Sequence, residues 1–99
     1  MPTNLPDNLA PQLADLARSL SASKLVLFGS RARGDHHERS DIDLAVYGMP
    51  EKNRGIFWLE AEELPTLLKF DIVHISPDMN QDFLHNIEKD GITLYAAED

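Results

Sequence analysis

Two carboxylates, Asp41 and Asp43, stand two residues apart at the head of an apolar run that ends at Tyr47. Side chains along a strand alternate between its two faces, so these carboxylates share one face while Ile42 points to the other. Two carboxylates about 7 Å apart on one face can hold a divalent cation between them. The spacing therefore indicates a metal site at the start of this strand.

A Gly-Ser pair, Gly29–Ser30, ends the preceding apolar run, and Arg31 and Arg33 follow it closely. A turn of this kind, opening into a short helix, offers backbone N–H groups and a hydroxyl to a phosphate. Ser30 is a candidate N-cap of a helical turn through Arg33, and Gly34 fits the left-handed position that closes such a turn. For Arg31 the sequence leaves two readings, an ordinary exposed face or a part of the site. A phosphate-binding turn beside a pair of metal carboxylates indicates a nucleoside triphosphate site.

A third carboxylate, Asp71, interrupts the apolar run Lys69–Ile75. Alternation puts Asp71 on the same face as Val73, between apolar neighbours, where an unpaired carboxylate is costly to bury. We therefore expect a cation or a hydrogen-bond partner beside Asp71.

The elements that must position these residues can be read from apolar periodicity. Strands are expected at Lys24–Phe28, Asp41–Tyr47, Lys69–Ile75 and, more briefly, Ile92–Tyr95. Helices are expected from Leu9 to Leu20 with Asp7 or Asn8 as cap, within 51–68 until Pro65 ends or kinks the helix, and over 79–90 after the turn Ser76–Asp78, with Gly91 as the stop. This order predicts an α/β fold: a small mixed sheet of three or four strands with helices mainly on one side.

Length and composition limit the function classes. The 99 residues suit one domain with a single core. The net charge of −8 argues against broad affinity for nucleic acid or an anionic membrane. There is no cysteine, which excludes disulfides and thiolate zinc sites, and no apolar run of membrane-spanning length. Without a signal-peptide pattern at the start, a reducing, cytoplasmic setting is expected.

The segments Gly29–Gly34 and Ser40–Leu44 together form a compound motif, in which Gly-Ser follows one strand and Asp-x-Asp begins the next. On these residues the sequence resembles the nucleotidyltransferases of the DNA polymerase β superfamily. Its size resembles that of the minimal nucleotidyltransferase (MNT) proteins, the antitoxin partners of HEPN-domain toxins. Asp71, in Phe70-Asp71-Ile72-Val73, matches the third carboxylate of the family. The resemblance implies a polymerase β-type fold and a single minimal nucleotidyltransferase domain over residues 1–99.

The resemblance also implies a role for each matched residue. In the family, Asp41 and Asp43 would bind Mg²⁺, and Asp71 would bind a second metal position or act as base for the acceptor hydroxyl. Gly29 and Ser30 would approach the β- and γ-phosphates of ATP. Arg33 belongs to the same loop motif and would either contact phosphate or brace the carboxylates. Physically this is two-metal phosphoryl chemistry, for which carboxylates and water suit Mg²⁺ and nothing here suits zinc.

The function that the resemblance implies is transfer of AMP from ATP to a tyrosine hydroxyl of a partner HEPN toxin, in a type VII-like toxin–antitoxin pair. The chain has no room for the acceptor-binding segments of larger members, so a partner protein is expected to supply the acceptor. Two alternatives stay open: a non-catalytic antitoxin that neutralises its toxin by occlusion, and nucleotidyl transfer to a small molecule or an RNA end. The three carboxylates favour an enzyme, and the negative charge argues against RNA.

Overall fold

The computed structural model describes residue 5 and residues 8–97, and within them helices and strands alternate along the chain. The elements are α1 (Leu9–Ser19), β1 (Lys24–Phe28), α2 (Ser30–Arg33), β2 (Ile42–Tyr47), α3 (Glu51–Glu62), β3 (Phe70–His74), α4 (Gln81–Asp90) and β4 (Ile92–Ala96). None of these helices is long and apolar enough to cross a membrane.

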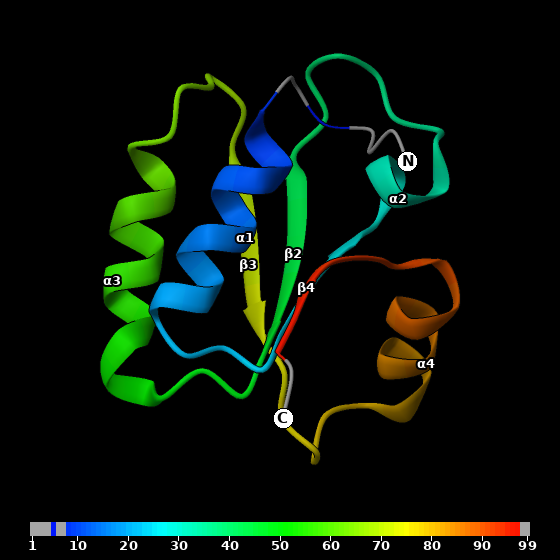
Figure 1. Cartoon of the computed structure of the whole chain (residues 1–99). Coiled ribbons are helices and arrows are strands. Elements are labelled where there is room, and N and C mark those ends of the chain that lie inside the picture. Colours follow the sequence, from blue (N-terminus) through cyan, green and yellow to red (C-terminus); the bar gives the residue numbers. More distant parts are fainter. Residues whose placement is uncertain (1–4, 6–7, 98–99) are drawn as a thin grey trace.

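The four strands form one mixed sheet in the order β3-β2-β1-β4. The central strand β1 runs antiparallel to both β2 and β4. β2 and β3 are parallel, and α3 is the crossover that connects them (Figure 1). The expected mixed sheet is therefore confirmed, with four strands. Its order brings the segments that contain Gly29, Asp43 and Asp71 onto three adjacent strands or strand ends.

The larger core lies between the sheet and the two long helices α1 and α3, which run side by side on one face (Figure 1). Leu25 and Leu27 of β1 point into this core, as their alternation requires. On the other face, Val26 and Ala45 meet Ile87 of α4 in a smaller cluster. Because α4 covers only part of that second face, the sheet leaves room for a site there.

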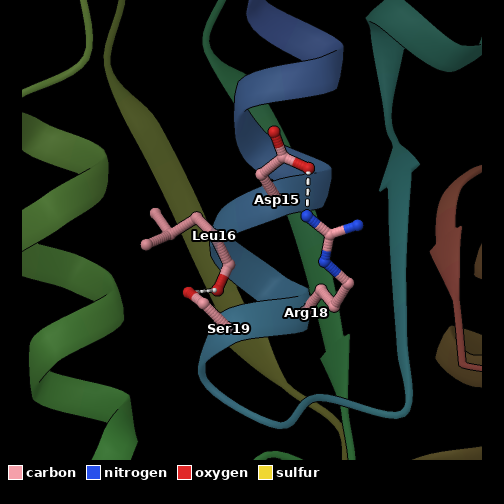
Figure 2. A network of polar contacts seen from close by, with 4 residues as sticks. All are labelled: Asp15, Leu16, Arg18 and Ser19. Carbon is pink, nitrogen blue, oxygen red and sulfur yellow. Dashed lines mark hydrogen bonds and ion pairs between the residues drawn. The ribbon is translucent and has the colours of Figure 1, made fainter.

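α1 follows the expected leucine and alanine spacing, with Leu9, Leu13 and Ala17 buried. Asn8 precedes the helix without a side-chain capping bond, and the alternative cap, Asp7, lies outside the described residues. The outer face of α1 is polar: Arg18 pairs with Asp15 at 2.8 Å (Figure 2). Since both side chains are exposed, this ion pair contributes little to stability.

α3 ends at Glu62, three residues before Pro65, and few of its residues are buried. Phe57 and Ala61 face the core, whereas Ile56 and Leu59 are exposed. The structure places Phe57 in the core and Trp58 at the surface.

α4 begins at Gln81, two residues later than expected, because Asn80 caps it. The Asn80 side chain accepts a hydrogen bond from the Phe83 N–H at 3.1 Å. In the turn before the helix, Asp78 accepts a hydrogen bond from the Ser76 hydroxyl. Gly91 does stop the helix, but its backbone is extended rather than left-handed. An added Cβ at this position would overlap the Ile87 carbonyl oxygen, so close packing explains the glycine.

Candidate active site

The carboxylates lie where the sheet topology brings three chain segments together. Asp43 is the second residue of β2, opposite Phe28 of β1 and beside Asp71 of β3. Neighbours in register share a face, so Asp43 and Asp71 are lateral neighbours on the face that α4 only partly covers. Asp41 directly precedes β2.

The neighbouring carboxylates affect the pKa of Asp43. The pKa of Asp43 is raised above its ordinary value, first by burial and then by the Asp71 and Asp41 carboxylates. The carboxyl groups of Asp43 and Asp71 are also close enough to share a hydrogen bond, while the charge of Arg33 lowers the Asp43 pKa. A proton or a bound cation would relieve the repulsion that these carboxylates exert on Asp43.

Asp71 differs from expectation in its burial. The sequence suggested a carboxylate between apolar neighbours, but Asp71 is exposed. The reason is that β3 forms an edge of the sheet and its outward face is not covered by a helix. Its partner is Asp43, and the predicted cost of burying Asp71 does not arise.

Gly29 brings the turn after β1 directly against the Asp43 carboxylate. Its φ of +75° lies in the region that favours glycine, and an added Cβ would overlap Asp43 Oδ2. Gly29 is also the N-cap residue of α2, so the prediction that Ser30 caps this turn is wrong: Ser30 is its first helical residue. Gly34, with φ of +87°, closes the turn in the left-handed conformation as expected.

The two arginines of the motif have different surroundings. Arg31 is only 4% exposed; its Nε donates to the Ser40 carbonyl at 3.0 Å and its Nη2 to the Glu38 carbonyl at 3.2 Å. The exposed-face reading of Arg31 is therefore wrong, because this side chain fastens the loop that leads to Asp41. Arg33 is exposed, pairs with Asp35 at 3.2 Å and acts by charge on Asp43.

The donor set fits a hard divalent cation. It consists of carboxylate oxygens, the ligands that Mg²⁺ prefers, and a cation would offset the repulsion from Asp71 and Asp41 that raises the Asp43 pKa. Within the described part of the chain, no three acidic or histidine side chains converge tightly enough to enclose a metal as they stand. The fit thus rests on two adjoining carboxylates, with Asp41 near enough to raise the Asp43 pKa.

Two open pockets flank the carboxylates, and sequence reasoning identified neither. The first, of about 380 Å³, lies between the end of β1 and α4. Its lining combines Phe28, Gly29 and Arg33 with Phe83, Asn86, Ile87 and Asp90. The four α4 residues follow helical spacing, which could have indicated one shared helix face. Phe28 and Phe83 pack edge to face, with ring centroids 6.0 Å apart.

The second pocket, of about 650 Å³, lies where the loops before β2 and β3 meet. It is lined by Glu38, Arg39, Asp41, Leu67, Leu68 and Lys69. No periodic signal in the sequence marks these two loops as neighbours, because the pairing of β2 with β3 joins them.

Comparison with known protein families identifies the chain. The family model described as "Polymerase beta, Nucleotidyltransferase" matches residues 12–99, nearly the whole chain. The chain belongs to this nucleotidyltransferase family. No curated protein matches it.

Solved structures share the fold of this nucleotidyltransferase. One is a toxin–antitoxin crystal structure with AMP-PNP, 22% identical, with a TM-score of 0.70 over 91% of this chain and 75% of that chain. Another is a mutant MntA–HpeT toxin–antitoxin complex, 20% identical, with a TM-score of 0.68 over 90% of this chain and 74% of that chain. A third is a tri-AMPylated Shewanella oneidensis HEPN toxin in complex with an MNT antitoxin, 19% identical, with a TM-score of 0.62 over 89% of this chain and 70% of that chain.

Proposed function

We propose that this nucleotidyltransferase transfers AMP from ATP to a tyrosine hydroxyl of a HEPN-domain toxin and so acts as the antitoxin of the pair. The observation that carries the proposal is the contact between the Asp43 and Asp71 carboxylates beside Gly29. The fold shared with an MNT antitoxin in complex with a tri-AMPylated HEPN toxin, and with a toxin–antitoxin complex containing AMP-PNP, supports the same acceptor and donor. ATP as donor suits a cytoplasmic protein.

In this proposal the residues around Gly29 hold the triphosphate. The backbone of Gly29 and Ser30 would approach the β- and γ-phosphates, and the absence of a side chain at Gly29 lets this backbone lie directly against the Asp43 carboxylate. Arg33 adds a positive charge on the same side of Asp43. Mg²⁺, held by Asp41 and Asp43, would neutralise the charge of the triphosphate and of the leaving pyrophosphate, which leaves Asp71 to act as the base.

The transfer is a single displacement at the α-phosphorus. The acceptor oxygen forms a bond to this phosphorus, and the bond from the α-phosphorus to the bridging oxygen of the β-phosphate breaks. Pyrophosphate leaves with the bonding electrons. The hydroxyl proton passes to the Asp71 carboxylate, and because Asp71 is exposed, it can release the proton to water.

The test uses ATP labelled at the α-phosphate, Mg²⁺ and lysate from the source cell. Wild-type protein should label one discrete protein band, and Asp41→Asn should abolish the label while keeping partner binding. Asp15→Asn, which removes an exposed carboxylate on α1, is the matched control and should label like wild type. Label appearing in RNA or in a small molecule would instead establish nucleotidyl transfer to that class of acceptor.

Occlusion of the toxin is the second candidate, and the exposed apolar side chains of α3 favour it. Ile56, Trp58 and Leu59 are each about half exposed, as expected for a surface that a partner covers. Occlusion predicts that Asp41→Asn neutralises the toxin as well as wild type does. If the Asp41→Asn variant still binds the toxin but no longer neutralises it, neutralisation depends on catalysis rather than on occlusion.

A further inference from the structure

The pocket where the loops before β2 and β3 meet has no part in the proposed handling of the triphosphate, apart from Asp41. A backbone hydrogen bond joins the ends of the two loops, since the Ile42 N–H donates to the Lys69 carbonyl at 2.8 Å. Lys69 directly precedes β3 and, by alternation, shares a face with Asp71. One lining residue of the pocket, Lys69, is therefore the neighbour, on the same strand face, of the residue that would take the acceptor proton.

The order of the strands gives this pocket a direction relative to the reaction. Gly29 follows β1, Asp43 lies on β2 and Asp71 lies on β3, so the carboxylates separate the phosphate-binding turn from the edge of the sheet. Displacement at phosphorus is roughly in line, with the attacking oxygen opposite the leaving pyrophosphate. With pyrophosphate on the Gly29 side, the acceptor must approach from the β3 side.

We propose that this pocket, lined by the loops before β2 and β3, binds the acceptor tyrosine side chain; the inference rests on the proposed function. Leu67 is fully exposed and Leu68 half-buried, and together they offer the ring an apolar wall. Arg39 and Lys69 supply positive charge near the phenolic oxygen, which gains negative charge as its proton leaves. Glu38 and Asp41 are the remaining charged groups of the lining, and these two acidic residues leave the pocket unsuited to a phosphate chain such as RNA.

The experiment compares Leu67→Ser with Asp15→Asn, a change at an exposed residue of α1 that lines neither this pocket nor the apolar surface of α3. Each variant is assayed for labelling of a short toxin peptide that contains the acceptor tyrosine, for release of pyrophosphate when water is the only acceptor, and for ATP affinity. Leu67→Ser should raise the KM for the peptide on the order of tenfold, the effect of losing one apolar contact. The pyrophosphate release and ATP affinity of Leu67→Ser should equal those of wild type, and Asp15→Asn should match wild type in all three measurements.

A second pair of variants tests the charged part of the pocket. Lys69→Gln should lower kcat for the peptide and shift its pH profile to higher pH, because the phenolic oxygen loses a stabilising cation. Lys89→Gln, at an exposed lysine of α4, should leave both unchanged.

Two results would refute the assignment of this pocket to the acceptor tyrosine and leave the proposed function standing. If the Leu67→Ser variant labels the peptide with the wild-type KM, the tyrosine does not bind in this pocket. A loss of ATP affinity in the same variant would assign the pocket to the nucleotide. Absence of any labelled protein with wild-type enzyme is a different result, because it refutes the proposed function itself.

Discussion

Gly29 is the residue at which one added methyl group would change the site most. Gly29→Ala places a Cβ against the Asp43 carboxylate and forces alanine into a positive φ. We expect a loss of about 1–2 kcal/mol in unfolding free energy, the cost of that backbone conformation for an L-residue, and loss of AMP transfer. Urea denaturation and the labelling assay measure the two effects.

Gly55→Ala is the matched control. Gly55 lies within α3, and an added Cβ there meets nothing within 4 Å. Alanine should stabilise the helix by about 0.5–1 kcal/mol and leave transfer unchanged. Equal losses in both variants would contradict the role given to Gly29.

Asp43 should make the metal-free protein less stable at neutral pH than at acidic pH. Its pKa in the folded protein is raised by burial and by Asp71, so its contribution is fully present below the unfolded pKa and is lost as pH rises through the raised value. Asp43→Asn removes this loss. With a chelator present to keep the protein metal-free, the Tm of the Asp43→Asn variant should therefore exceed that of wild type by an amount that grows as pH rises toward 7.

Mg²⁺ should reverse the order of these Tm values. A cation that binds only the folded state raises Tm, and the wild-type carboxylates bind it better than the variant does. Asp15→Asn, at an exposed ion pair, should follow wild type throughout. Equal Tm values for wild type and Asp43→Asn at every pH would show that the carboxylates do not repel one another.

At the scale of elements, Arg31 links α2 to the loop before β2. Arg31→Met would leave the carbonyls of Ser40 and Glu38 without these donors. We expect a loss of about 1–3 kcal/mol, the usual range for unsatisfied buried groups, and faster hydrogen exchange in residues 35–41. Arg18→Met breaks only the exposed pair of Figure 2, so its effect should stay within about 1 kcal/mol.

How far the elements could be predicted depends on the range of the interactions that set them. The strands were predicted to within a residue or two, because their apolar runs are local features of the sequence. The phase of α3 could not be derived, since Phe57 and Trp58 are both apolar and only packing against α1 and the sheet separates them. Strand order was equally inaccessible, because it depends on segments far apart in the chain.

The site shows the same division. The motif residues around Gly29 and Asp43 could be found from type and spacing, and the structure brings them into contact. The exposure of Asp71 follows from the edge position of β3, which no local pattern reports. The burial of Arg31 follows from the path of the loop that it fastens. The roles of these residues in AMP transfer stay predictions.

At the scale of the whole molecule, one core of α1, α3 and the sheet sustains the fold, and Phe57 is a large, fully buried member. Phe57→Ala should cost about 3–5 kcal/mol. That is a large part of the roughly 5–15 kcal/mol typical of a domain, so the variant should unfold at much lower urea concentration. Trp58→Ala removes a larger side chain from the next position but should cost far less, because Trp58 is 51% exposed.

The parallel pairing of β2 with β3 has a consequence for the order of folding events. β1 and β2 are joined by the short helix α2 and a loop, whereas β2 reaches β3 only after the whole of α3. Closing the longer loop costs more chain entropy, so the first pair is expected to form before the second. Asp71 then comes next to Asp43 only when β3 pairs with β2. A nascent chain meets the mutual repulsion of its acidic residues only at that late stage, when most of the core is present to offset it.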